Sequence, residues 1–109
     1  MNETDTIARA LAQIAGVASV TRGWPKQTAK LPCVALQLKE RSAVDTRDNE
    51  VYLTKHVYLL RVFAQTMGGC DALREDIIAA MGALGYALER AREKDSDTAQ
   101  LQMTFEKLE

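Results

Sequence analysis

Hydrophobic residues recur with the period of an α-helix near the start of the chain. Their spacing is that of one helix face and predicts a helix over residues 5–15. The apolar stripe consists of Ile7, Leu11, Ile14 and Ala15. Thr4 or Asp5 can accept a hydrogen bond from a free backbone N–H as the N-cap, and Gly16 follows as a stop signal.

The same period returns in the second half of the chain. Met67-Gly68-Gly69 is expected to end a preceding strand, and residues 70–84 then read as a helix. Its stripe consists of Leu73, Ile77, Ala80, Met81 and Leu84. Carboxylates in the early turns suit the positive end of the helix dipole.

Five segments are rich in β-branched residues or alternate between apolar and polar positions, which is typical of strands. The predicted strands cover residues 17–22, 33–39, 51–64, 86–92 and 99–105. Residues 40–50 are mostly polar. We expect them to form a long solvated connection that is mobile at its tip.

The strand predicted over residues 51–64 has two apolar faces in its second half. Val57, Leu59 and Phe63 share one face with Arg61, while the other face is also apolar. A strand buried on one side would alternate cleanly with polar residues. We therefore expect a second layer over this strand, from a helix of the same chain or from a neighbouring subunit.

The order of predicted elements is α-β-β-β-α-β-β. We expect an α+β fold in which two helices pack on one face of an antiparallel sheet of four to five strands. The length of 109 residues suits one domain over residues 1–109.

Composition narrows the functional classes. Net charge is −1, with 14 Lys+Arg against 15 Asp+Glu, whereas proteins that bind nucleic-acid phosphates or anionic lipid carry a positive excess. The first residues are acidic, and the longest run without a charged or strongly polar residue, 77–88, is too short to span a membrane. We expect a protein of a cytoplasm-like compartment, with no nucleic-acid or membrane partner and with Cys33 and Cys70 reduced.

Catalytic and cofactor motifs are missing from the sequence, so we expect no enzyme, no cofactor and no metal. Cys70 lies near a helix N-terminus, but the sole histidine, His56, falls in a strand and a third member of a triad is missing. Trp24 has two readings that stay open here: a ring that caps the core, or a contact hot spot.

Several stretches together resemble the tail-terminator, or tail-completion, proteins of long-tailed bacteriophages and prophages. The similarity covers nearly the whole chain as an order of elements. The stretches are Gly16-Val17, Leu31-Pro32-Cys33-Val34, residues 57–64, Met81-Gly82-Ala83-Leu84-Gly85-Tyr86 and Gln102-Met103-Thr104-Phe105-Glu106.

The resemblance implies a non-enzymatic virion protein. It would cap the tail tube as a ring, usually of six subunits, stop tube polymerisation and offer a surface for joining the head. Its partners would be further copies of itself, the tail tube protein and a head–tail connector or neck protein. It would be found in the host bacterial cytoplasm during assembly and then at the head-proximal end of the virion tail.

A ring needs an interface between two different patches. The pattern of exposed charges, the two-faced strand and the lone tryptophan supply the candidates. The candidate interface residues are Trp24, Arg47, Asp48, Glu50, Val57, Leu59, Arg61, Phe63, Arg90 and Arg92. Three other readings stay open: another neck or head-completion protein, a small ligand-binding regulatory domain on a ferredoxin-like sheet, and a small enzyme that uses Cys70 or His56.

Overall fold

The computed structural model describes residues 2–26, 29–47, 50–94 and 98–109, and for residues 44–47 and 50–52 it describes the backbone alone. The elements are α1 (Glu3–Ala12), β1 (Ser19–Arg22), β2 (Cys33–Arg47), β3 (Glu50–Ala64), α2 (Met67–Ala83), β4 (Ala87–Lys94) and β5 (Ala99–Leu108). This confirms the predicted order of elements and the α+β class. Neither described helix is both long and apolar enough to cross a membrane.

The five strands form one mixed sheet in the order β1-β2-β3-β5-β4. The pairs among β2, β3, β5 and β4 are antiparallel as predicted. The expectation is wrong for β1, which runs parallel to β2 from Ser19↔Cys33 to Arg22↔Leu36. The segment between β1 and β2 returns to the end of the sheet where β1 begins, as a parallel pair requires. The alternation of residues within one strand does not indicate the direction of its neighbour.

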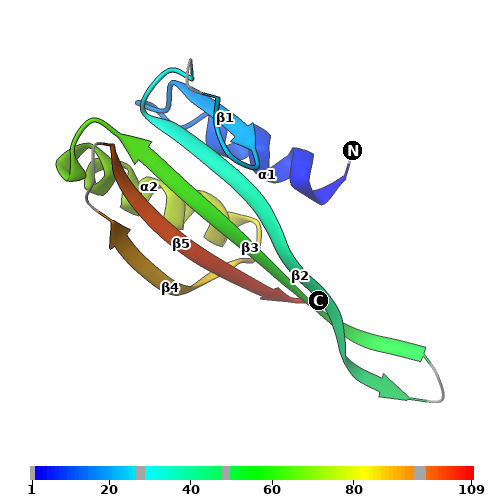
Figure 1. Cartoon of the computed structure of the whole chain (residues 1–109). Helices are drawn as coiled ribbons and strands as arrows, with labels where there is room; N and C mark the ends of the chain where they lie inside the picture. Colours follow the sequence, from blue (N-terminus) through cyan, green and yellow to red (C-terminus); the bar gives the residue numbers. More distant parts are fainter. Residues whose placement is uncertain (1, 27–28, 48–49, 95–97) are drawn as a thin grey trace.

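Both helices cover the same face of the sheet, as predicted (Figure 1). Even-numbered residues of β2 and β3 point into this layer, and α1 and α2 bury their apolar stripes against them. The largest fully buried side chains are Tyr58, Phe105, Ile7, Leu11, Leu36, Leu60, Ile77, Met81, Leu101, Met103, Val34 and Val62. The neighbouring central strands β3 and β5 contribute three of these side chains each.

The helices begin earlier than predicted because of their caps. Asn2, not Thr4 or Asp5, caps α1: its side-chain oxygen accepts from the Asp5 N–H at 2.8 Å. Thr66 caps α2 by accepting from the Gly69 N–H at 3.1 Å, so the glycine pair lies inside the first turn. A Cβ at Gly69 would lie 3.1 Å from the Ala64 Cβ, which explains why a small residue is needed there.

The prediction of a solvated connection over residues 40–50 is wrong. β2 continues to Arg47, β3 begins at Glu50, and these two residues pair. Register shifts at Leu38/Glu40, Ala43/Asp45 and Asp45/Thr46 interrupt the alternation along β2. Bulges of this kind remove the two-residue period by which a strand is found in a sequence.

The far part of this β-hairpin has no third strand beside it. β5 reaches Leu108, which pairs with Lys55, and Thr54 then exchanges backbone hydrogen bonds with Glu109. Beyond the Ala43↔Thr54 pair, the described backbone of the hairpin pairs only with itself. We call residues 43–54 the hairpin arm. Figure 1 shows the arm extending beyond both helices, and the molecule measures 51 × 27 × 24 Å.

The packing predicts unequal costs for two leucines of the same strand. Leu60→Ala removes a fully buried side chain and should lower the free energy of unfolding by about 2–5 kcal/mol. Leu53→Ala, at a position that is 38% exposed, should cost less than about 1 kcal/mol. Urea unfolding monitored by circular dichroism measures both, and equal costs would contradict the assignment of the core to the helix-covered face.

Candidate interaction surface

The face of the sheet opposite the helices is not covered by any helix of the described chain. It brings together most of the residues predicted as interface candidates, because odd-numbered residues of β3 point away from the core. Their cross-strand partners extend the surface: Arg61 pairs with Gln102 and Gln102 with Arg92. We call this surface the open face; it consists of Ala35, Gln37, Val57, Leu59, Arg61, Phe63, Arg90, Arg92, Lys94, Gln100, Gln102 and Thr104.

Trp24 lies on the open face and not in the core. Its ring centroid is 6.0 Å from that of Phe63, and the Arg61 guanidinium carbon lies 4.5 Å from the Trp24 ring centroid. Arg61 Nη1 also donates to Gln37 Oε1 at 3.0 Å, which holds the guanidinium in place. Since 67% of Trp24 stays exposed, the core-capping reading is wrong. Stacked Trp and Arg side chains are the residue types enriched in contact hot spots.

An apolar hollow of about 300 Å³ opens beside this tryptophan. It is lined by Trp24, Pro25, Lys26, Ala29, Leu31, Phe63 and Thr98. Leu31 is 37% exposed within it. The hollow therefore offers an anchoring place for an apolar group from outside the chain, at the end of the open face where β2 begins.

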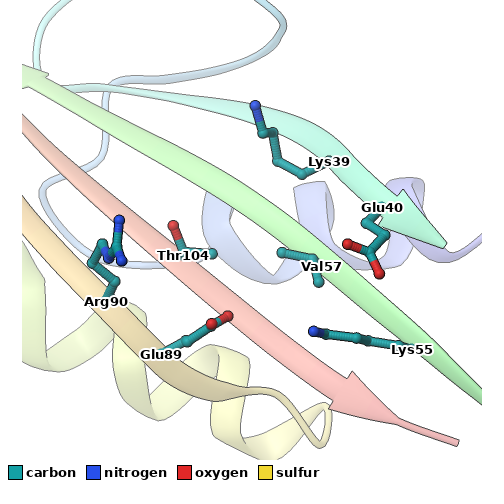
Figure 2. A pocket seen from close by; sticks show the side chains of 7 residues that line it. All are labelled: Lys39, Glu40, Lys55, Val57, Glu89, Arg90 and Thr104. Atoms are coloured by element: carbon teal, nitrogen blue, oxygen red, sulfur yellow. The ribbon is translucent and has the colours of Figure 1, made fainter. Parts of the chain in front are cut away.

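The other end of the open face carries charges of both signs. A hollow of about 320 Å³ lies over the four antiparallel strands, and Figure 2 shows the side chains that line it. It is lined by Lys39, Glu40, Lys55, Val57, Glu89, Arg90 and Thr104. Val57 and Leu59 are buried within the chain itself. The exposed apolar area of the open face is therefore concentrated around Trp24 and the first hollow. The sequence pattern predicts it along β3 instead.

Three buried polar atoms on and beside the open face have no hydrogen-bond partner among the described residues: Arg61 Nε, Gln100 Nε2 and Thr21 Oγ1. Gln100 is 5% exposed, although the alternation of the last strand predicts its side chain on a polar, solvated face. Buried polar atoms without a hydrogen-bond partner are costly, and a partner could reach these atoms only if the side chains that cover them moved.

The remaining interface candidates lie in the hairpin arm, away from this tryptophan. Arg47 and Glu50 form its last described pair, and Asp48 lies outside the described residues. Trp24 contacts Phe63, whose partner Cys33 begins β2, whereas the arm lies at the opposite end of the same two strands. The structure thus divides the candidates between two separate parts of the molecule.

A polar junction at the root of the arm was not predicted. Glu3 of α1 accepts from Arg41 Nη2 at 3.0 Å and lies 3.1 Å from His56 Nδ1. Arg41 Nε also donates to His56 Nδ1 at 3.3 Å. Glu109 brings a further carboxylate close to this group. The Arg41 guanidinium bridges Glu3 of α1 and His56 of β3. The junction therefore links α1 to the base of the arm.

The structure separates the two groups on which a small enzyme would depend. Cys70 is fully buried, and its Sγ lies 3.4 Å from the Val62 carbonyl and 3.6 Å from the Ala99 carbonyl. Burial, with a smaller effect of the nearby Asp71 carboxylate, raises the pKa of the Cys70 thiol above its ordinary value. His56 is held in the polar junction instead. The described residues therefore give this thiol no base.

No protein-family model matches the sequence, and no curated protein matches it. The fold is similar to that of a chain in a solved structure, the virion of a native gene transfer agent (GTA) particle. The TM-score is 0.67 at 17% sequence identity, and the alignment covers 95% of this chain and 91% of that chain. At this identity the likeness shows a shared fold.

The burial of both cysteines predicts slow alkylation. Cys33 and Cys70 should react with iodoacetamide at neutral pH no faster than the protein unfolds, because neither sulfur is accessible and the Cys70 thiolate is disfavoured. Both should react rapidly in urea, which serves as the control. Mass spectrometry reads the labelling, and fast modification of Cys70 in the native protein would revive the enzyme reading.

Proposed function

We propose that this protein is a non-enzymatic structural component of a phage or prophage virion that caps the tail tube as a ring of six subunits. The ring would end tube polymerisation and provide the surface for joining the head. The observation that carries the proposal is the hairpin arm, which projects from the domain and, beyond the hydrogen bonds of Thr54 with Glu109 at its base, pairs only with itself.

An isolated two-stranded hairpin is marginal in water. The arm continues past the last residue of β5, so no third strand supports it within the described chain. Both of its edges leave backbone N–H and C=O groups free to pair. A neighbouring surface that packs against the arm would offset the entropy lost in ordering it, and this is the situation of an arm that reaches another subunit.

A closed ring also requires two unlike patches on each subunit. The arm at one end and the open face around Trp24 at the other are unlike surfaces, so each subunit offers its neighbours more than one kind of patch. Because the two surfaces lie far apart along β2 and β3, they favour a head-to-tail contact between copies. They do not favour a two-fold contact in which the same patch meets itself. The fold similarity to a virion chain supports the same class of function, and the resemblance seen in the sequence supports the position at the tail end.

The proposed function implies a location and a set of partners for the protein. It would assemble in the host bacterial cytoplasm and then occupy the head-proximal end of the tail, in contact with the tube protein and a neck protein. A neck or head-completion protein is the second candidate, because the similar solved chain is named only for the virion as a whole. Both candidates share the arm and its use in assembly.

Native mass spectrometry over a wide concentration range tests the ring. A discrete six-subunit species is the expected result. A dimer that carries a bound small molecule would instead favour a regulatory domain, and a monomer at all concentrations up to the millimolar range would contradict self-assembly of the free protein into a ring.

Shortening the arm tests its role. Replacing residues 44–53 with Asn-Gly joins the paired Ala43 and Thr54 through a two-residue turn of a favoured type. We expect the folded monomer to keep its thermal midpoint within a few degrees, because the deleted residues lie outside the core, while the ring is lost. Replacing residues 48–49 alone with Asn-Gly keeps the arm's length and should leave the ring intact. A ring formed by the shortened variant would remove the arm from the interface.

A further inference from the structure

The charged residues are divided between the two sides of the molecule. On the open face, Arg92 and Lys94 point the same way from β4, and Arg61 lies one strand beyond β5 in the row of Arg92. Neither Arg92 nor Lys94 has an ion-pair partner among the described residues. Lys26 lines the adjacent hollow. We call Arg61, Arg92, Lys94 and Lys26 the basic half of the open face.

On the opposite side of the molecule, α2 exposes more carboxylates than cations, since its one basic residue, Arg74, is partly buried. α2 buries Cys70, Leu73, Ile77 and Met81 against the sheet and turns Asp71, Glu75 and Asp76 outward. In the part of the chain that the structure describes, these three carboxylates also lack ion-pair partners. The other exposed positions of this helix face are small: Ala72, Ala79, Gly82 and Ala83. Another surface can therefore approach α2 closely.

The exposed cations of the open face specify what its partner supplies. Arg92 and Lys94 lie in the rows of Gln102 and Gln100, next to Arg61 and Phe63 on β3. Arg61 is stacked on Trp24, which ties the tryptophan to the same patch. A partner that brings carboxylate oxygens to this place pairs with the cations through charge-assisted hydrogen bonds.

We infer that the acidic face of α2 in a second copy of this chain docks on the basic half of the open face. This inference rests on the proposed ring and names one of its contacts. Asp71, Glu75 and Asp76 supply the acceptor oxygens, while Trp24 and its hollow provide the apolar anchor of the contact. The two patches lie on opposite sides of one molecule, so the contact is head-to-tail, which is the kind that closes into a ring.

A short helix fits this surface better than a nucleic acid does. The basic half ends where the second hollow begins, and there Glu40 and Glu89 join the lining. A continuous phosphate backbone would run into these carboxylates. The α2 carboxylates instead lie within residues 71–76 and so span less than about two helical turns, roughly 10 Å.

A charge swap within one chain tests the docking. Arg61 is left unchanged, because it supports Trp24. One variant carries Arg92→Glu and Lys94→Glu, a second carries Glu75→Lys and Asp76→Lys, and a third carries all four changes. We expect each of the first two variants to need at least a 10-fold higher protein concentration for assembly than the wild type. The third variant should assemble near the wild-type concentration, because it restores opposite charges across the contact. Arg9→Glu, at an exposed position of α1, is the control and should assemble like the wild type.

Trp24 reports on the same contact directly, because it is the only tryptophan. Its emission should shift to shorter wavelength as the wild-type chain assembles, and Trp24→Phe should keep the fold while weakening assembly. The inference is overturned if the wild type forms a ring and both charge-reversed variants form it equally well, a result that leaves the proposed function standing. If the wild type forms no ring, both fail. A Trp24 shift caused by a double-stranded oligonucleotide, and not by concentration, would assign the surface to nucleic acid.

Discussion

The antiparallel pairing of β2 with β3 is the interaction on which the rest of the structure depends. Both strands are 15 residues long and pair from Cys33↔Phe63 to Arg47↔Glu50. One half of this ladder lies at the centre of the sheet, where β1, β5 and both helices assemble around it. The other half continues as the arm. A single ladder of backbone hydrogen bonds thus runs from the centre of the domain into its projecting part.

The placement of both helices on one face decides the character of the other. The covered face takes the large apolar side chains, and the open face keeps the arginines, glutamines and Trp24. On this face, polar atoms such as Gln100 Nε2 have no hydrogen-bond partner in the described chain. The proposed assembly gives a role to both the arm and the open face, neither of which contributes large side chains to the core.

The helical stripes, the two-faced strand and the final alternation of residues 99–105 were sufficient to predict the order of elements, because each depends on a local period. The same reasoning failed where the period is broken. The bulges in β2 hid the second half of that strand, and the Thr66 cap placed the glycine pair inside α2. The candidate surface was found in part: Trp24, Arg61 and Phe63 meet, whereas Gln100 and the Glu3–Arg41–His56 junction went unpredicted.

By itself, the sequence determined the fold class, the two amphipathic helices and the residues of the core, since these follow from hydrophobic spacing along consecutive positions. The tertiary structure alone decided that β1 runs parallel to β2, that residues 40–47 belong to a strand, and that Trp24 stacks on Arg61 and stays exposed. These features depend on residues far apart in the chain. Their energy comes from cross-strand pairing and stacking, which a local pattern does not record.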